Sequence, residues 1–298
     1  MATNSATNLK VQRHWRNAAT PRASFYLGKA IVYTLLVVIS IWFTLPLVWM
    51  VMTSLMPIDQ VGKFPPEWIP RTWRFQNYSD ALDLWNFKVT FSNTVIITTA
   101  TITGNLVSST LVAYGFARFR FPFRDTLFLV LLATMMLPFA VLLIPVYIGY
   151  NELGLVNTFW PLILPHFFGN AFFIFLGRQF FIGIPQDLID AAKIDGASEL
   201  GIFTRIMVPL AKPAIIVMAI LSFQNSWNEC LGPLIYLKDS KLHTLALGLY
   251  YFQGLPGQGS MQNLLMAATV MMVIPVLVVF FLFQRQFVQG ANLSGIKG

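Results

Sequence analysis

Long uncharged stretches separated by short charged segments dominate the chain. No Asp, Glu, Lys or Arg lies between Lys29 and Asp59, or between Lys88 and Arg118. Each gap exceeds the roughly 20 apolar residues that cross a bilayer as a helix. Four further apolar stretches follow, and the pattern predicts six transmembrane helices over 30–54, 92–117, 127–149, 159–182, 213–237 and 262–283.

These spans are expected to be helices. Within lipid, every backbone N–H and C=O must be paired inside the protein, and a helix does this within one segment. No ten-residue segment alternates between apolar and polar positions, which disfavours a β-barrel. The sequence therefore predicts an all-α polytopic membrane protein. No internal repeat is visible, which disfavours a secondary transporter built from duplicated halves.

The connections divide the charge unevenly. The chain carries 20 Lys and Arg against 12 Asp and Glu, a net charge of +8. With six spans, 14 of the 20 basic residues fall on the side of both termini. Cytoplasmic loops carry the excess of Lys and Arg, so both termini are expected in the cytoplasm. The N-terminal arm would be 1–29, the membrane domain 30–283 and the C-terminal tail 284–298. The surplus is then a topology signal, and no nucleic-acid partner is expected.

The composition excludes an ordinary soluble domain and offers no catalytic chemistry. Hydrophobic residues make up 56% and charged residues 11% of the chain, against about 45–50% and 25% in soluble domains. The single cysteine, Cys230, provides no paired ligands, and no carboxylate stands at metal-ligand spacing from His14 or His243. No Gly-x-x-x-x-Gly-Lys-Ser/Thr stretch is present. We expect no enzyme activity, metal or cofactor in this chain, so any energy input must come from another subunit, or the protein is passive.

Two long connections carry most of the remaining information. The first, 56–91, is expected outside and contains Trp68, Trp73, Tyr78 and Trp85. It suits either an interfacial aromatic belt with a short amphipathic helix or a docking surface for an external partner.

The second connection, the 183–212 loop, is expected in the cytoplasm. Pro185 suits the first position of a helix, and Gly196 suits the residue after a helix end, where positive φ is needed. Ala197 to Val208 can form a second helix, stopped at Pro209. The loop is either a helix–glycine–helix unit that projects from the membrane or an amphipathic loop resting on it. In the first case Phe203 and Ile206 would offer apolar contacts, next to small side chains.

This loop resembles the signature, or EAA, loop of ABC importer permeases. The matching positions are Asp190-Ala191-Ala192, Gly196, Ile206 and Pro209, with Asp190 where the family usually has Glu. The resemblance extends to the carbohydrate-type permeases similar to the smaller membrane subunit of the maltose importer. It includes the Ala113-Tyr114-Gly115-Phe116-Ala117-Arg118 run and the pair Trp227-Asn228.

The resemblance implies partners and contact residues. The loop would dock on a cytoplasmic ATPase through Asp195, Gly196, Ala197, Ser198, Glu199 and Phe203, with Ala191 and Ala192 supporting the turn. The tail, Gly295, Ile296, Lys297 and Gly298, would also reach the ATPase pair. The complex would contain a second related permease, two ATPase subunits that hold ATP and magnesium, and an extracytoplasmic solute-binding protein, in a bacterial or archaeal inner membrane.

The implied function is uptake of a sugar or oligosaccharide by alternating access. The alternatives are a glycerol-phosphate or polyol importer subunit and a transporter that needs no ATPase. Candidate residues of the translocation pathway are Asn93, Asn225, Asn228 and Glu229. Glu229 is the one acid inside an expected span, and such residues usually face a water-filled path or the bundle interior. A solvated position near the outer end of the helix is the other interpretation.

Overall fold

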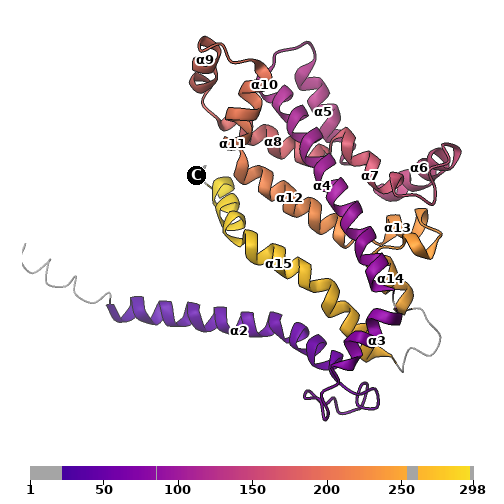
Figure 1. The fold of residues 1–298 in the computed structure, drawn as a ribbon. Helices are drawn as coiled ribbons and strands as arrows, with labels where there is room; N and C mark the ends of the chain where they lie inside the picture. Colours follow the sequence, from indigo (N-terminus) through magenta and orange to yellow (C-terminus); the bar gives the residue numbers. More distant parts are fainter. Residues whose placement is uncertain (1–21, 85, 254–260, 296–298) are drawn as a thin grey trace, which may run out of the picture.

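The computed structural model describes residues 22–84, 86–253 and 261–295, with side chains for 25–84, 86–253 and 261–284. The regular secondary structure of these residues is helical throughout. The longest helices are α2 (Arg22–Ser54), α4 (Phe87–Arg118), α12 (Lys212–Trp227) and α15 (Gln262–Gly295). In Figure 1, α4, α12 and α15 run diagonally beside one another, and the N-terminal part of α2 projects away from them.

Shorter helices complete the fold. They are α3 (Gln76–Leu84), α5 (Arg124–Thr134), α6 (Phe139–Glu152), α7 (Trp160–Ile163), the 3-10 helix η1 (Leu164–Phe168), α8 (Ala171–Gly183), α9 (Gln186–Ile194), α10 (Glu199–Ile202), the π-helix η2 (Phe203–Met207), α11 (Val208–Leu210), α13 (Leu231–Tyr236), the 3-10 helix η3 (Ser240–Leu242) and α14 (Leu245–Gln253).

Four of the described helices are long and apolar enough to cross a membrane. They are Phe25–Ser54, Phe87–Arg118, Trp160–Gly183 and Gln262–Gln284. Two bent pairs pass the same test together, Arg124–Thr134 with Phe139–Glu152 at 95° and Glu199–Leu210 with Lys212–Trp227 at 78°. By length and composition, the described helices give four spans, or up to six when each bent pair counts as one. The prediction of an all-α polytopic membrane protein is confirmed.

The third and fifth spans are not the continuous helices that hydropathy predicts. The 127–149 stretch breaks between Thr134 and Phe139, where Pro138 has extended backbone (ψ 133°). Proline has no N–H to donate and disfavours helical backbone at the preceding residue, so the chain turns here. The 213–237 stretch breaks after Trp227, and α13 begins at Leu231. There Glu229 Oε1 accepts the N–H of Gly232 at 2.8 Å, which satisfies a free donor of the new helix.

The first and last spans are longer than expected. α2 begins at Arg22, inside the expected N-terminal arm. α15 continues to Gly295, so the expected boundary at 284 between span and tail lies within a helix. Pro46 and Pro275 lie inside α2 and α15. The short helix expected in the 56–91 segment is α3, and its Asn77 amide donates to the backbone oxygens of Ser54 and Met56 at 2.8 and 2.9 Å. α3 is thereby fastened to the end of α2.

A buried stripe of polar side chains on α4 connects most of the bundle. Its members recur at helical spacing and are each less than a tenth exposed: Thr90, Thr94, Thr98, Thr101, Asn105 and Ser109. Asn105 Nδ2 donates to Ser222 Oγ on α12 at 2.9 Å, and Ser226 Oγ donates to Thr98 Oγ1 at 3.2 Å. Small and hydrogen-bonding side chains let membrane helices approach closely. α4 is therefore the helix against which α8, α12 and α14 are positioned.

Gly177 sets the distance between α8 and α4. A Cβ atom there would lie 2.9 Å from the Cβ of Ala113 on α4 and 3.0 Å from Cε of Met218 on α12. We expect Gly177→Ala to destabilise the protein by about 1–3 kcal/mol through overpacking. The purified complex should then unfold at a lower temperature than wild type. Gly115→Ala is the matched control, since no atom lies within 4 Å of the Cβ position of Gly115. Its unfolding temperature should be no lower than that of wild type. A Gly177→Ala protein as stable as this control would contradict the close contact.

Candidate functional site

The 183–212 loop folds as a helix–glycine–helix unit, as predicted. α9 ends at Ile194, and Gly196 follows with a φ of +80°. The Gly196 N–H donates to Lys193 O at 3.1 Å, and the Ala197 N–H donates to Ala192 O at 2.9 Å. These two bonds make a Schellman motif, which satisfies the last carbonyls of the helix. Ser198 Oγ then accepts the Gly201 N–H at 3.2 Å and caps the next helix.

The second helix of this unit does not stop at Pro209. It continues through α10, η2 and α11 to Leu210, and the chain bends at Ala211 before α12. In η2 the backbone is widened to a π-helix, where the Val208 N–H donates to Phe203 O, five residues back. A normal turn would set the Pro209 ring against the carbonyl four residues earlier. The widened turn just before Pro209 avoids this clash, so the helix continues past the proline to Leu210.

The expected contact residues of the loop fall into two groups. Ala191, Asp195, Gly196, Ala197, Ser198, Glu199 and Pro209 are exposed. Ala192 and Phe203 are buried, at 9% and 7% exposure, and Ile206 is half-buried. The expected surface contact of Phe203 is therefore wrong. Its ring lies 5.1 Å from that of Tyr114 and 6.4 Å from that of Phe181, between centroids, so it attaches the loop to α4 and α8.

Glu199 joins the two helices of the loop to α4. Its Oε1 lies 2.7 Å from Lys193 Nζ on α9, and its Oε2 accepts a hydrogen bond from the Tyr114 hydroxyl at 3.0 Å. The Lys193 ammonium group holds the pKa of the Glu199 carboxyl below its usual range. Glu199 was expected to contact the ATPase, yet both of its carboxylate oxygens bind groups of this chain.

Arg118 at the end of α4 clamps the start of the loop. Its guanidinium donates to the backbone oxygens of Phe181 and Ile184, the latter at 2.6 Å, and to Gln186 Oε1 at 2.8 Å. Carbonyls at a helix C-terminus lack partners within the helix, and a cation is favoured there. The sequence identified Arg118 as the charge that ends an apolar stretch and as part of a family motif. Its partners lie too far along the chain for spacing to reveal them.

The turn of the 183–212 loop carries two exposed apolar side chains that the sequence reasoning missed. Ile194 is 87% exposed and Leu200 is 66% exposed. They lie on either side of Gly196, among the exposed acids Asp190 and Asp195. Large exposed apolar groups framed by polar residues are typical of protein interaction surfaces. Their position next to a glycine turn was the signal that could have identified them.

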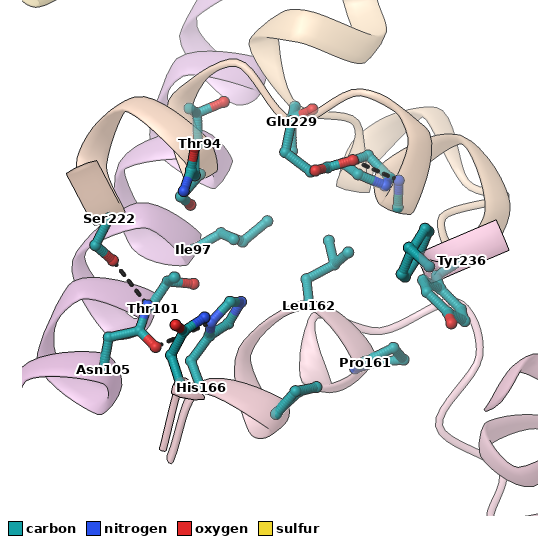
Figure 2. A pocket seen from close by; sticks show the side chains of 18 of the residues that line it. Thr94, Ile97, Thr101, Asn105, Pro161, Leu162, His166, Ser222, Glu229 and Tyr236 are labelled. Carbon is teal, nitrogen blue, oxygen red and sulfur yellow. Dashed lines mark hydrogen bonds between the residues drawn. The ribbon is translucent and has the colours of Figure 1, made fainter. Parts of the chain in front are cut away.

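A second candidate site is a cavity of about 300 Å³, the α4–α12 cavity (Figure 2). It lies between α4 and α12, is bordered by residues of α6, α7, η1 and α13, and is partly open. Its polar lining residues are Thr94, Thr101, Asn105, Tyr150, His166, Asn170, Ser222, Asn225, Ser226, Glu229, Tyr236 and Thr244. Ligand sites combine an apolar wall with a few polar groups in this way.

The four expected pathway residues separate into two pairs. Asn225 and Glu229 line the α4–α12 cavity, although Glu229 lies in the break after α12 rather than inside a helix. Asn93 does not line it. Its amide is buried and donates to Lys241 O and His243 O at 2.8 and 3.0 Å, so it fastens α4 to a distant loop. Asn228 is exposed and donates to Gln224 O at 2.9 Å, also away from the cavity lining.

The remaining expected contacts lie at the chain's end. Gly295 is the last residue of α15, while Ile296, Lys297 and Gly298 lie outside the described residues. Over the described part of the chain, no group of three His, Cys, Asp or Glu side chains is placed to hold a metal ion.

The Arg118 clamp can be tested by hydrogen exchange. Arg118→Gln removes charge-assisted hydrogen bonds worth about 1.5–3 kcal/mol, so amides of 184–196 should exchange about ten- to a hundredfold faster by mass spectrometry. Arg120→Gln is the control, because Arg120 is exposed and has no side-chain hydrogen bond among the described residues. Equal exchange in both variants would show that Arg118 does not hold the loop.

Comparison with known proteins identifies the family. Residues 105–292 match the family described as the binding-protein-dependent transport system inner membrane component. The arabinooligosaccharides transport system permease protein AraQ of Halalkalibacterium halodurans is 38% identical over 70% of this chain and 74% of its own length. The sn-glycerol-3-phosphate transport system permease protein UgpE of Rhizobium meliloti is 31% identical over 89% of this chain and 96% of its own length.

A solved structure shares the fold. The crystal structure of a bacterial ABC transporter involved in the import of the acidic polysaccharide alginate contains a chain that matches with a TM-score of 0.77. The match covers 88% of this chain and 97% of that chain at 24% identity. The chain therefore belongs to the inner membrane components of binding-protein-dependent transport systems, the permease subunits of ABC transporters.

Proposed function

We propose that this chain is the permease subunit of an ATP-driven importer for a sugar or oligosaccharide and that the 183–212 loop couples it to the ATPase. The observation that carries the proposal is the exposed turn at Gly196, held between two capped helices and flanked by Ile194 and Leu200. A rigid projection with an apolar end suits insertion into a cleft of a partner.

The internal contacts of the loop suit force transmission. A push on α9 or α10 reaches α4 through the Glu199–Tyr114 hydrogen bond and the buried Phe203 ring. It also reaches α4 through Arg118, which holds the junction of α8 and α9. Because packed cores deform little, displacement of the loop would move α4 rather than dissipate in the loop.

The partners follow from what this chain lacks or exposes. Its sequence has no phosphate-binding loop, so we assign ATP and magnesium to two cytoplasmic ATPase subunits. The α2 side chains from Phe25 to Val48 are exposed and largely apolar, which suits lipid and a second, related permease in a heterodimer. The family's dependence on a binding protein supports an extracytoplasmic solute-binding protein as the source of solute.

The substrate class rests on the relatives and on the cavity. AraQ is named for arabinooligosaccharides and UgpE for sn-glycerol 3-phosphate, so a glycerol-phosphate or polyol importer is the alternative. The cavity lining holds no Lys or Arg, the side chains that usually bind phosphate, and this favours the sugar. An ATPase-independent transporter would leave the projecting loop without a function.

The coupling role can be tested at Gly196. Valine is strained at a φ of +80° and should distort the turn at a cost of at least about 1–2 kcal/mol. We expect Gly196→Val to abolish ATP-dependent uptake and solute-stimulated ATP hydrolysis in the assembled importer, while the chain still reaches the membrane.

Asparagine provides the matched control. It tolerates the left-handed region, and no atom lies within 4 Å of the Cβ position of Gly196. Gly196→Asn should therefore retain most of the uptake. Normal transport by Gly196→Val, with normal amounts of protein in the membrane, would refute the coupling role of the loop.

A further inference from the structure

We propose that the turn between α4 and α5 binds the headgroup of an anionic phospholipid, while the ring of Phe123 inserts at the border of headgroups and acyl chains. This α4–α5 turn is the segment 119–124, with the sequence Phe-Arg-Phe-Pro-Phe-Arg. It follows the end of α4 that also contacts α9 and α10 (Figure 1). The site belongs neither to a solute path nor to the coupling loop, so it does not depend on the proposed function.

The backbone of the turn is unusual for the residue it carries. The Arg124 N–H donates to Phe121 O at 3.3 Å, which closes a β-turn with Pro122 second and Phe123 third. Phe123 has a φ of +60° and a ψ of 15°. A type II turn places positive φ at this third position, where Gly or Asn is normally found. A side chain with a Cβ atom is strained there, so the backbone alone does not favour phenylalanine.

Packing within the chain does not account for the Phe123 ring either. The ring is 77% exposed and contacts no other ring among the described residues. The two neighbouring rings do have partners on α4. Phe119 lies 5.3 Å from Tyr114, and Phe121 lies 5.7 Å from Phe116, between centroids. A strained residue whose side chain is held outward indicates a contact with something outside the chain.

The exposed face of α5 indicates that this contact is lipid. Phe123, Leu127 and Val130 follow one another at spacings of four and three, so they lie along one face of the helix. Leu127 is 49% exposed and Val130 is 55% exposed. Together with α6, α5 is long and apolar enough to cross a membrane. Phe123 therefore begins an apolar stripe that suits acyl chains, at the level where aromatic side chains enter the headgroup boundary.

The charges around the turn favour an anionic headgroup. Arg124 Nε lies 3.0 Å from Asp125 Oδ1, and an Arg178 Nη atom on α8 lies 4.0 Å from the same oxygen. Arg120 is exposed and has no side-chain hydrogen bond or ion pair among the described residues. Three guanidinium groups and one carboxylate leave a net charge of +2 at this place. Arginine binds phosphate oxygens through two parallel hydrogen bonds, so a phosphodiester would complete the set.

The cations and the ring meet at one open hollow of about 410 Å³. It is lined by Arg120, Phe121, Phe123, Arg124, Asp125 and Thr126. A zwitterionic headgroup carries its own cation, which the arginines would repel, whereas an anionic headgroup does not. Each basic side chain near a membrane surface favours anionic lipid by about a factor of five. Since Arg120 is the lining cation without a described partner, we expect about a fivefold preference.

The test places a photocrosslinker at the ring. The assembled importer, with p-benzoylphenylalanine in place of Phe123, is reconstituted in nanodiscs that contain equal amounts of phosphatidylglycerol and phosphatidylcholine. On irradiation the benzophenone inserts into nearby C–H bonds, and the mass of the chain identifies what was captured. We expect lipid adducts, with phosphatidylglycerol exceeding phosphatidylcholine about fivefold.

Two arginine variants of the crosslinking chain separate the site from general charge. Arg120→Gln should lower the ratio of phosphatidylglycerol to phosphatidylcholine adducts about fivefold. Arg205→Gln is the matched control. Arg205 is also exposed, has no side-chain hydrogen bond or ion pair among the described residues, and does not line the hollow. It removes the same charge from η2, so the ratio should stay at its original value.

Phe123→Asn separates the lipid contact from folding. Asparagine adopts positive φ more readily than phenylalanine, and the lost ring is exposed. The importer that carries this substitution should therefore unfold in detergent at a temperature no lower than wild type. A lower unfolding temperature would show that the ring packs within the protein, which would overturn its assignment to lipid.

The crosslinking outcomes decide the remaining points. Adducts with another protein chain in place of lipid, or no adduct at all, would overturn the turn as a lipid site. Equal capture of the two lipids would overturn the selection for an anionic headgroup, as would an unchanged ratio in Arg120→Gln. An equal loss in Arg120→Gln and Arg205→Gln would show that diffuse charge, rather than this hollow, attracts the lipid.

Discussion

A helix that carries polar side chains through lipid is stable only if most of them have partners, and α4 shows how far this requirement shapes the protein. Asn105 binds α12 and η1, Ser109 accepts the backbone N–H of Asn170 at the start of α8, and Thr94 accepts the N–H of Leu245 at the start of α14. Unsatisfied polar groups are more costly in a membrane than in water, so these bonds fix where the neighbouring helices begin and cross.

Because α4 meets both candidate sites, it connects them. Its last turn holds the 183–212 loop through Tyr114 and Arg118, and its middle turns form one wall of the α4–α12 cavity through Ile97 and Thr101. The opposite wall comes from α12, which follows the loop after the bend at Ala211. Movement of the loop would therefore act on both walls of the cavity. The proposed coupling would then need only a rigid-body shift of two packed helices.

The sequence predicted features that local chemistry determines and missed those that need distant partners. Apolar length located the spans, and the need for positive φ identified Gly196. Hydropathy could not show that the third span bends by 95°, because Pro138 is compatible with a kink or a full break. Phe203 was expected on the surface and is buried, since its partners Tyr114 and Phe181 are remote in sequence. Asn93 was assigned to the pathway for the same reason.

The contrast between Asn93 and Thr101 shows what the structure adds to a list of polar residues in spans. Both lie on α4 and both are buried. Asn93 donates both of its described bonds to backbone oxygens, so its polarity is explained by folding alone. Thr101 has no partner among the described residues, and folding alone does not explain it. Polar groups within a membrane helix are expensive, so those with protein partners serve the architecture. Thr101 lines the α4–α12 cavity and Thr53 does not, so the cavity accounts for at most one of the two buried threonine hydroxyls without a partner among the described residues.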